Sequence, residues 1–180
     1  AGQEFEKYVV SRLPTHKVVS HEITPETCNQ TILLMKEKTP IIYSAPFENN
    51  TNRTRGVIDL LVREDYISKL FPDCNYIETP NSCKYVAVDI KFTTLQLRAD
   101  GKHLLNSGRF PAYKGQLKIY TDFLTTIQGE TKWAGVIGRR YNYTSKGEIY
   151  TGMDIYDKIG WIDYTTVDLE YVELTNKAIE

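Results

Sequence analysis

The spacing of apolar and polar residues predicts three helices. Residues 4–13 carry apolar side chains at helical intervals and are followed by Pro14, and residues 24–38 begin with the Thr–Pro pair typical of a helix N-terminus. In residues 112–128, apolar positions recur every three to four residues. Each helix therefore has an apolar side that another element must cover.

Four short apolar runs predict strands, over residues 40–47, 56–64, 84–92 and 132–141. Residues 93–111 show weak periodicity and predict a loop, and residues 147–164 predict peripheral structure. The elements follow the order helix, helix, three strands, helix, strand. This order predicts a mixed α/β fold in which helices surround a central sheet.

Charged residues interrupt two of these strands. Side chains alternate between the faces of a strand, so Asp89 and Lys91 are expected on the face opposite the core residues Val86, Val88, Ile90 and Phe92. On that face they would need no buried partner. Asp59 is likewise expected opposite Ile58, Leu60 and Val62. If the two strands pair, two carboxylates and one ammonium group meet on the sheet.

Such a group of charges has a chemical use. Two close carboxylates repel each other unless a cation lies between them, and Mg²⁺ prefers carboxylate, water and phosphate oxygens. A bound divalent ion polarises a phosphoryl oxygen and makes a water nucleophilic, while a nearby Lys offsets developing charge. The pattern favours phosphodiester hydrolysis. An exposed ion pair between Asp89 and Lys91 is the alternative interpretation of the strand pattern taken alone.

Composition narrows the function classes. A chain of 180 residues is expected to form one domain, and no apolar run is long enough for a membrane span, so no membrane partner is expected. The three scattered cysteines predict neither a disulfide framework nor a zinc site, which favours an intracellular location. The net charge is −1, but residues 91–118 contain six Lys or Arg and one acid, Asp100.

Three sequence motifs in order carry a family resemblance. "GVIDLL" at residues 56–61, "VDIK" at 88–91 and "GQLKIY" at 115–120 together resemble the core motifs of the PD-(D/E)XK nuclease superfamily, specifically its RecB-like branch. The matching residues are Asp59 in the first motif, Asp89 and Lys91 in the second, and Gln116 and Tyr120 in the third. The Pro that often precedes the first Asp is replaced here by Ile58.

The resemblance implies a fold and a reaction. The expected fold is a restriction-endonuclease-like central mixed β-sheet flanked by helices, with an αβββαβ core. Residues 1–180 would form a single nuclease domain excised from a longer protein. The expected reaction is hydrolysis of DNA phosphodiester bonds with little sequence specificity, using one or two Mg²⁺ or Mn²⁺ ions and no iron–sulfur cluster. Whether the enzyme is an endonuclease or an exonuclease stays open.

The resemblance also implies roles for single residues. Asp59, Asp89 and the backbone carbonyl of Ile90 would bind the metal, Lys91 would activate water, and Gln116 with Tyr120 would orient groups beside the site. "GQEFEKYVV" is similar to the acidic N-terminal helix of many relatives, which makes Glu6 a candidate third ligand. Glu4, His16 and His21 are the alternatives for that position.

Basic residues after Lys91 are the expected contacts to nucleic acid, namely Arg98, Lys102, Arg109, Lys114 and Lys118, with Arg139 and Arg140 extending the groove. DNA is favoured over RNA. The alternatives are a viral, cap-snatching-like RNA endonuclease and a non-catalytic nucleic-acid-binding module on the same fold. Expected partners include other replication or repair domains, and the expected location is the cytoplasm, the nucleus or a viral replication site.

Overall fold

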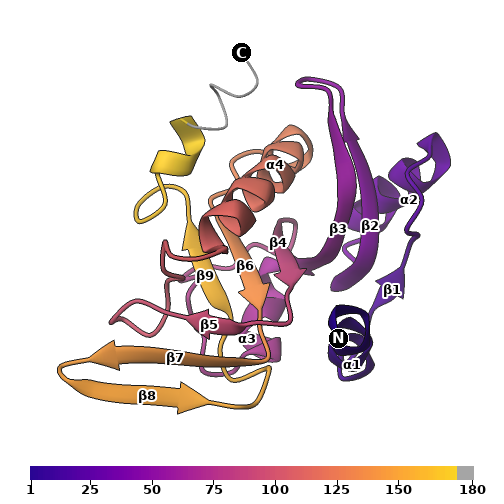
Figure 1. Cartoon of the computed structure of the whole chain (residues 1–180). Helices are drawn as coiled ribbons and strands as arrows, with labels where there is room; N and C mark the ends of the chain where they lie inside the picture. The colour runs from indigo at the N-terminus through magenta and orange to yellow at the C-terminus, as the bar shows by residue number, and fades with distance from the viewer. Residues whose placement is uncertain (174–180) are drawn as a thin grey trace.

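The computed structural model describes residues 1–173 and has the mixed α/β fold predicted from the sequence (Figure 1). Its main sheet has six strands in the order β1-β2-β3-β4-β6-β9. Their bounds are Lys17–Val18 (β1), Ile41–Asn49 (β2), Thr54–Arg63 (β3), Tyr85–Ile90 (β4), Trp133–Ile137 (β6) and Gly160–Asp163 (β9). The β1–β2 and β4–β6 pairs are parallel and the other pairs are antiparallel, so the sheet is mixed.

Helices cover both faces of this sheet (Figure 1). They are α1 (Gly2–Ser11), α2 (Pro25–Lys36), α3 (Ile67–Leu70) and α4 (Phe110–Gln128), with a 3₁₀ turn, η1 (Glu64–Tyr66), before α3. Side chains of α2 and α4 share one buried cluster with the sheet, which we call the α4 core. Side chains of α1 and α3 share the other, the α1 core. Strand β4 is buried along its whole length because both of its faces are covered.

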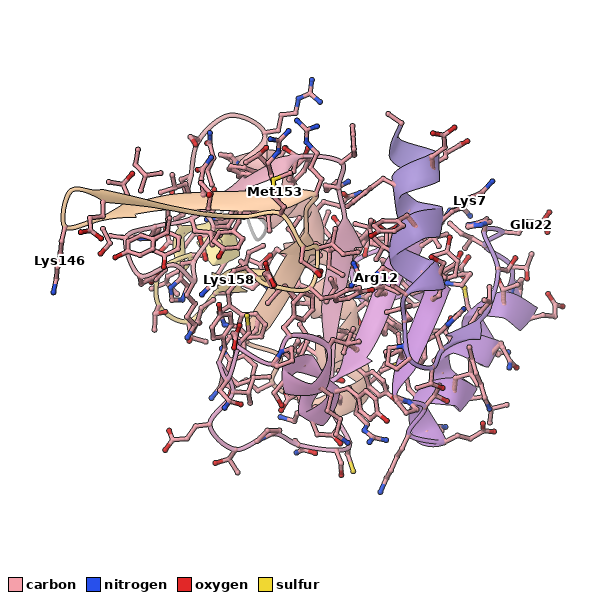
Figure 2. All side chains as sticks on the ribbon, turned by 90° about the horizontal axis from the view of Figure 1, so that it is seen from below. Lys7, Arg12, Glu22, Lys146, Met153 and Lys158 are labelled. Atoms are coloured by element: carbon pink, nitrogen blue, oxygen red, sulfur yellow. The ribbon has the colours of Figure 1, made fainter. Side chains whose placement is uncertain are left out.

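A smaller sheet projects from the main body. Its three strands, in the order β5-β7-β8, are β5 (Thr94–Gln96), β7 (Arg140–Ser145) and β8 (Glu148–Gly152). Strands β7 and β8 form a long hairpin that extends away from the sheet and carries Lys146 at its tip (Figures 1 and 2). Lys146 and Gly147 both have positive φ, at 52° and 79°, as the tight turns of such hairpins require.

Local sequence explains where the helices begin and end. The Thr24 hydroxyl accepts a hydrogen bond from the Thr27 N–H, and the Thr27 hydroxyl accepts one from the Thr24 N–H, which gives α2 a reciprocal N-terminal cap ahead of Pro25. Helix α4 ends at Gly129, whose φ of 85° is accessible to glycine at little cost. No helix within residues 1–173 is long and apolar enough to cross a membrane.

The prediction of a loop over residues 93–111 is wrong. This segment contains β5, and its Leu95, Leu97 and Leu104 are buried in the α4 core. The prediction of peripheral structure over residues 147–164 holds for β8 in the smaller sheet but not for β9, which pairs with β6 in the main sheet and buries Trp161 completely. β5 and β9 are short strands, and contacts with distant strands decide their structure.

Candidate active site

A paired bend in β2 and β3 places the first acidic residue. Ser44 has a φ of 56°, unusual for a residue with a side chain, and it lies opposite Asp59 between the pairs Tyr43–Leu60 and Ala45–Ile58. Its hydroxyl lies 2.8 Å from both the Ser20 carbonyl and His21 Nδ1, which holds the bend in place.

The strands change face at this bend. Ile58 packs in the α4 core, whereas Leu60 and Val62 pack in the α1 core. The prediction that these three residues share one face is therefore wrong, because simple alternation stops at Asp59. The carboxylate of Asp59 consequently leaves the sheet at the point where the two cores meet.

Asp59 is also where β3 and β4 separate. Their pairing extends from Arg63–Tyr85 to Leu60–Val88 and does not include the next pair of residues. Instead, the Ile90 N–H donates a 2.8 Å hydrogen bond to Asp59 Oδ2. Burial raises the pKa of Asp59 to about 6, against the effect of this hydrogen bond and with a smaller contribution from the negative charge of Glu6.

Asp89 is the most deeply buried acid of the site, with 3 % of its surface exposed. Burial, followed by the negative charge of Asp59, raises the pKa of Asp89 to about 7, although the Lys91 charge acts in the opposite direction. Within the described residues, Asp89 Oδ2 has no hydrogen-bond partner. The prediction that Asp89 lies on an uncovered face is therefore wrong: Tyr85 and Ala87 on that face belong to the α4 core.

Lys91 provides the positive charge. Its Nζ lies 3.9 Å from Asp89 Oδ2, too far for a hydrogen bond, and 4.9 Å from the centre of the Tyr113 ring on α4. About 30 % of the Lys91 side chain is exposed. The ammonium group is therefore held beside the buried carboxylates and can still reach a ligand from solvent.

The helix motif divides into a buried and an exposed residue. Tyr120 is buried against Phe47, with ring centres 5.5 Å apart, and its pKa is raised by burial and then by the charges of Asp89 and Asp59. Tyr120 therefore lies near enough to both carboxylates to feel their charge. Gln116 is exposed one turn earlier on α4.

The candidate third ligands gather around Tyr43. Its hydroxyl donates a 2.6 Å hydrogen bond to Glu6 Oε2, and the rings of His16 and His21 meet its ring edge-on at 6.3 and 6.2 Å. The charge of His21 lowers the pKa of Asp59 while that of Glu6 raises it. Glu4 is exposed in the first turn of α1. Glu6 and His21 are far from Asp59 in sequence, yet both are near enough in the fold for their charges to change its pKa.

A divalent cation fits the buried Asp89 and half-buried Asp59 carboxylates. They repel each other, each has a raised pKa, and one oxygen of Asp89 has no hydrogen-bond partner in the described chain. A hard cation with oxygen ligands would satisfy that oxygen and relieve the repulsion. Residues 1–173 contain no group of three or more His, Cys, Asp or Glu side chains arranged to hold a metal. Main-chain, water or substrate oxygens would thus complete the coordination.

No family model, curated protein or solved structure matches this chain.

One predicted nucleic-acid contact is wrong. Lys114 is fully buried, and its Nζ donates hydrogen bonds of 2.6 Å to the Leu104 carbonyl, 2.9 Å to Asn106 and 2.6 Å to Asp168. An ammonium group on the buried side of an amphipathic helix needs such a set of acceptors. Its role is therefore in the core and not in a nucleic-acid groove.

The other predicted cations lie in different environments. Lys118 pairs with Asp122 one turn later on α4, and Lys102 lies 4.8 Å over the Tyr76 ring. Arg98 and Arg109 are exposed. The two arginines are therefore the more accessible members of the predicted set.

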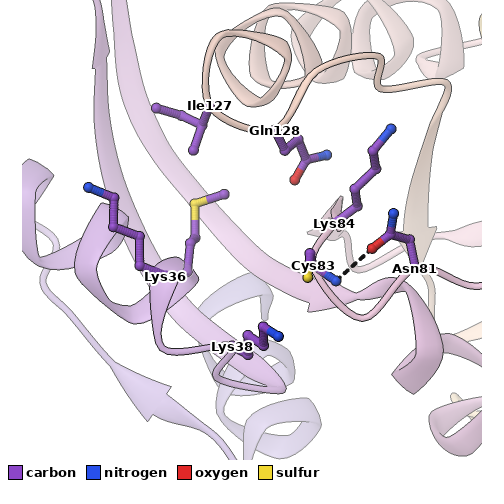
Figure 3. Close-up of a pocket in the computed structure, with 8 residues that line it drawn as sticks. Lys36, Lys38, Asn81, Cys83, Lys84, Ile127 and Gln128 are labelled. Atoms are coloured by element: carbon purple, nitrogen blue, oxygen red, sulfur yellow. Dashed lines mark hydrogen bonds between the residues drawn. The ribbon is translucent and has the colours of Figure 1, made fainter.

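A separate basic pocket lies at the opposite end of β4 (Figure 3). It has a volume of about 370 Å³ and is lined by Met35, Lys36, Lys38, Asn81, Cys83, Lys84, Ile127 and Gln128. Lys84 precedes the strand and Asp89 nearly ends it, so the pocket is roughly 17 Å from the carboxylates along β4. This pocket is not part of the candidate active site.

Tyr43 and Ser44 are the site residues that sequence reasoning missed. Both lie in an apolar strand, where Tyr43 resembles an ordinary strand residue. A polar Ser44 between Ile42 and Ala45 was the available signal of a break in the strand.

Proposed function

We propose that this chain is a metal-dependent nuclease domain that hydrolyses phosphodiester bonds in DNA. The observation that carries the proposal is Asp89, a buried carboxylate with an oxygen lacking a hydrogen-bond partner in the described chain. Burial, followed by the negative charge of Asp59, raises the pKa of Asp89, and the Lys91 ammonium lies 3.9 Å away. The order of elements α1, β2, β3, β4, α4 and β6 also suits a restriction-endonuclease-like core of the PD-(D/E)XK type.

In this proposal, Asp59 and Asp89 hold one or two Mg²⁺ or Mn²⁺ ions, with the Ile90 carbonyl and water or substrate oxygens as further donors. Within residues 1–173, Glu6, which accepts the Tyr43 hydrogen bond, is not placed with them as a third ligand. The ion, when bound, supplies a Lewis acid for a phosphoryl oxygen and lowers the pKa of a bound water. The Ile90 N–H fixes one oxygen of Asp59, so the orientation of that carboxylate is set before any ligand arrives.

Lys91 and Tyr120 act around these carboxylates. The protonated Nζ of Lys91 attracts the phosphate and orients the attacking water, and the Tyr113 ring restricts its position. Tyr120 is buried near Asp59 and Asp89, and in this buried environment charge interactions are stronger than at the surface. Gln116, exposed on the same helix, is available to substrate.

Cleavage assays with matched variants test this function. Labelled single-stranded and duplex DNA are incubated with Mg²⁺, Mn²⁺ or EDTA, and products are resolved on gels. We expect cutting that requires the metal, is lost in both Asp89→Asn and Lys91→Ala, and persists in the exposed control Lys36→Ala. We expect Mn²⁺ to raise the melting temperature of Lys91→Ala but not of Asp89→Asn. A wild-type domain that cuts no DNA or RNA with either metal refutes the proposal.

A second candidate, an RNA endonuclease, is favoured by the position of His21. Its ring nitrogen Nδ1 is 2.8 Å from Ser44 Oγ, and its charge acts on Asp59. Viral cap-snatching-like endonucleases combine a His with an Asp and an acid–Lys pair. Faster cutting of single-stranded RNA than of DNA of the same sequence, reduced by His21→Ala, would favour this candidate.

A further inference from the structure

A cleft lies immediately beside the candidate active site. It begins at Phe92, the residue after Lys91, and has a volume of about 330 Å³. Its lining comes from the start of β5, the start of α4 and the junction of β6 and β7, and consists of Phe92, Thr93, Thr94, Gln96, Ser107, Gly108, Arg109, Phe110 and Arg139. No acidic residue lines it. Phe110 of this lining lies 6.1 Å from the Tyr113 ring, which the Lys91 Nζ approaches to 4.9 Å, so the cleft connects to the candidate active site through Tyr113.

Two arginines give the cleft its charge. Neither Arg109 nor Arg139 forms an ion pair with any residue in 1–173. Arg139 is fixed at both ends: its N–H donates to the Thr93 carbonyl at 2.9 Å, and its guanidinium lies 4.9 Å over the Phe92 ring. The Arg139 Nε is buried and has no hydrogen-bond partner in this part of the chain. Donors held in this way suit a phosphate.

The cleft also has an aromatic edge. Phe92 contacts the Arg139 guanidinium at 4.9 Å and the tilted Phe5 ring of α1 at 5.5 Å, yet 49 % of it remains exposed. Unpaired bases stack on such rings and on guanidinium planes, whereas the bases of a duplex already stack on each other. An exposed aromatic ring beside unpaired arginines therefore favours a single strand.

The cleft continues onto one face of the smaller sheet. Thr94 and Gln96 line the cleft, and they pair with Arg140 and Asn142 of β7. Asn142 in turn pairs with Thr151 of β8. Paired residues project from the same face, so all five lie on the cleft side.

The two faces of the β7–β8 hairpin differ in composition, one carrying tyrosines and the other mostly polar residues without acids. Tyr141, Tyr143 and Tyr150 stack on the opposite face, the first two packing against the α4 core. The cleft side carries no acid on β5, β7 or β8, since Glu148 shares the tyrosine face through its pairing with Ser145. Figure 2 shows how far this hairpin extends from the body of the protein.

We infer that the cleft and this hairpin face bind single-stranded DNA next to the scissile phosphate, an inference that rests on the proposed nuclease function. Arg109 and Arg139 hold the phosphate that neighbours the scissile one. The base of that nucleotide stacks on Phe92. The strand then continues over the polar face of β7 and β8 toward Lys146.

Binding measurements in an Asp89→Asn background test the inference, because that background removes cleavage and one of the two carboxylates that repel phosphate. Fluorescence anisotropy follows a labelled 12-nucleotide oligo-dT, a duplex of equal length and the matching RNA. The variants are Arg109→Gln with Arg139→Gln, Phe92→Leu, and the control Lys36→Gln with Arg55→Gln, which removes the same charge at exposed positions elsewhere. Thermal melting confirms that each variant folds.

We expect the arginine pair to weaken binding of the single strand at least 10-fold and to lower the slope of log K against log salt by about 0.7–1.4. Phe92→Leu should weaken it about 5- to 100-fold, and the control less than 2-fold. Tighter binding of the duplex, or affinity unchanged in the arginine pair, overturns the inference and leaves the nuclease proposal standing. Tighter binding of RNA overturns the assignment to DNA. Arginine-dependent binding without cleavage by the wild-type protein refutes the nuclease function alone.

Discussion

Replacing Asp89 by Asn is expected to stabilise the metal-free protein at pH 8. The carboxylate is buried, has one oxygen without a hydrogen bond in the described chain, and lies against Asp59. An amide of the same shape removes the negative charge and therefore the repulsion. A residue proposed to be indispensable for activity should thus be a source of instability when no metal is bound.

The magnitude follows from the pKa of Asp89, which burial raises from 3.8 to about 7. The folded state therefore keeps this proton between about pH 4 and pH 7, while the unfolded state has lost it, so the free energy of unfolding falls as the pH rises through that range. A difference of about 3 pH units corresponds to about 4 kcal/mol. Because the amide has its own desolvation cost, we expect a gain of roughly 2–4 kcal/mol at pH 8.

Thermal denaturation in EDTA at pH 4.5 and pH 8 measures this gain. Asp89→Asn should melt roughly 5–15 °C above wild type at pH 8 and close to it at pH 4.5. In Mn²⁺ at about 100 times its Kd, wild type should gain about 2.7 kcal/mol and the variant should not. The exposed control Asp73→Asn should change stability by less than about 0.5 kcal/mol at both pH values. The reasoning is refuted if Asp89→Asn melts no higher than wild type at pH 8, or if its melting temperature exceeds that of wild type by the same amount at pH 4.5 as at pH 8.

Two further predictions concern stability away from the site. Asp168→Asn should lower the free energy of unfolding by about 3–5 kcal/mol in chemical denaturation, because it leaves the buried Lys114 ammonium without its counter-charge; a change below about 1 kcal/mol would contradict a stabilising role for this pair. Lys146→Asn should protect the amides of β7 and β8 from hydrogen exchange by about 0.5–1 kcal/mol, because Asn adopts the positive φ before Gly147 more readily than Lys. Lys146→Val should have the opposite effect, and equal protection in both variants would show that backbone conformation does not limit the turn.

Much of the fold could be predicted because the apolar periodicity is strong where elements are long. The helices α1, α2 and α4 and the strands β2, β3, β4 and β6 lie close to their predicted ranges. The short strands β5 and β9 could not be found in this way, since a strand of three or four residues carries too little pattern and takes its structure from its partners. The order of strands in the sheet likewise depends on contacts between distant segments, which a local pattern does not contain.

The candidate site shows where the alternation rule fails. Alternation predicts that Asp59 and Asp89 each lie opposite the core residues of their own strand and can meet if the strands pair. In the structure, Asp59 and Lys91 are both near enough to Asp89 for their charges to act on it. Alternation could not reveal that α4 covers that face, which makes Asp89 a buried acid, or that Lys114 faces the core. The burial of Asp89 and the orientation of Lys114 both depend on how α4 packs on the sheet. The apolar pattern of a single sequence does not specify that packing.

The bend at Ser44 and Asp59 has a mechanical consequence. At the hairpin end of the pair, Phe47 and Ile58 pack in the α4 core. Beyond the bend the strands contribute to both cores, with Leu61 in the α4 core and Leu60 and Val62 in the α1 core. One pair of strands thus belongs to both cores, and Asp59 sits at the joint between them. Neither core can shift against the other without moving this carboxylate, so the geometry of the site is tied to the packing of the whole domain.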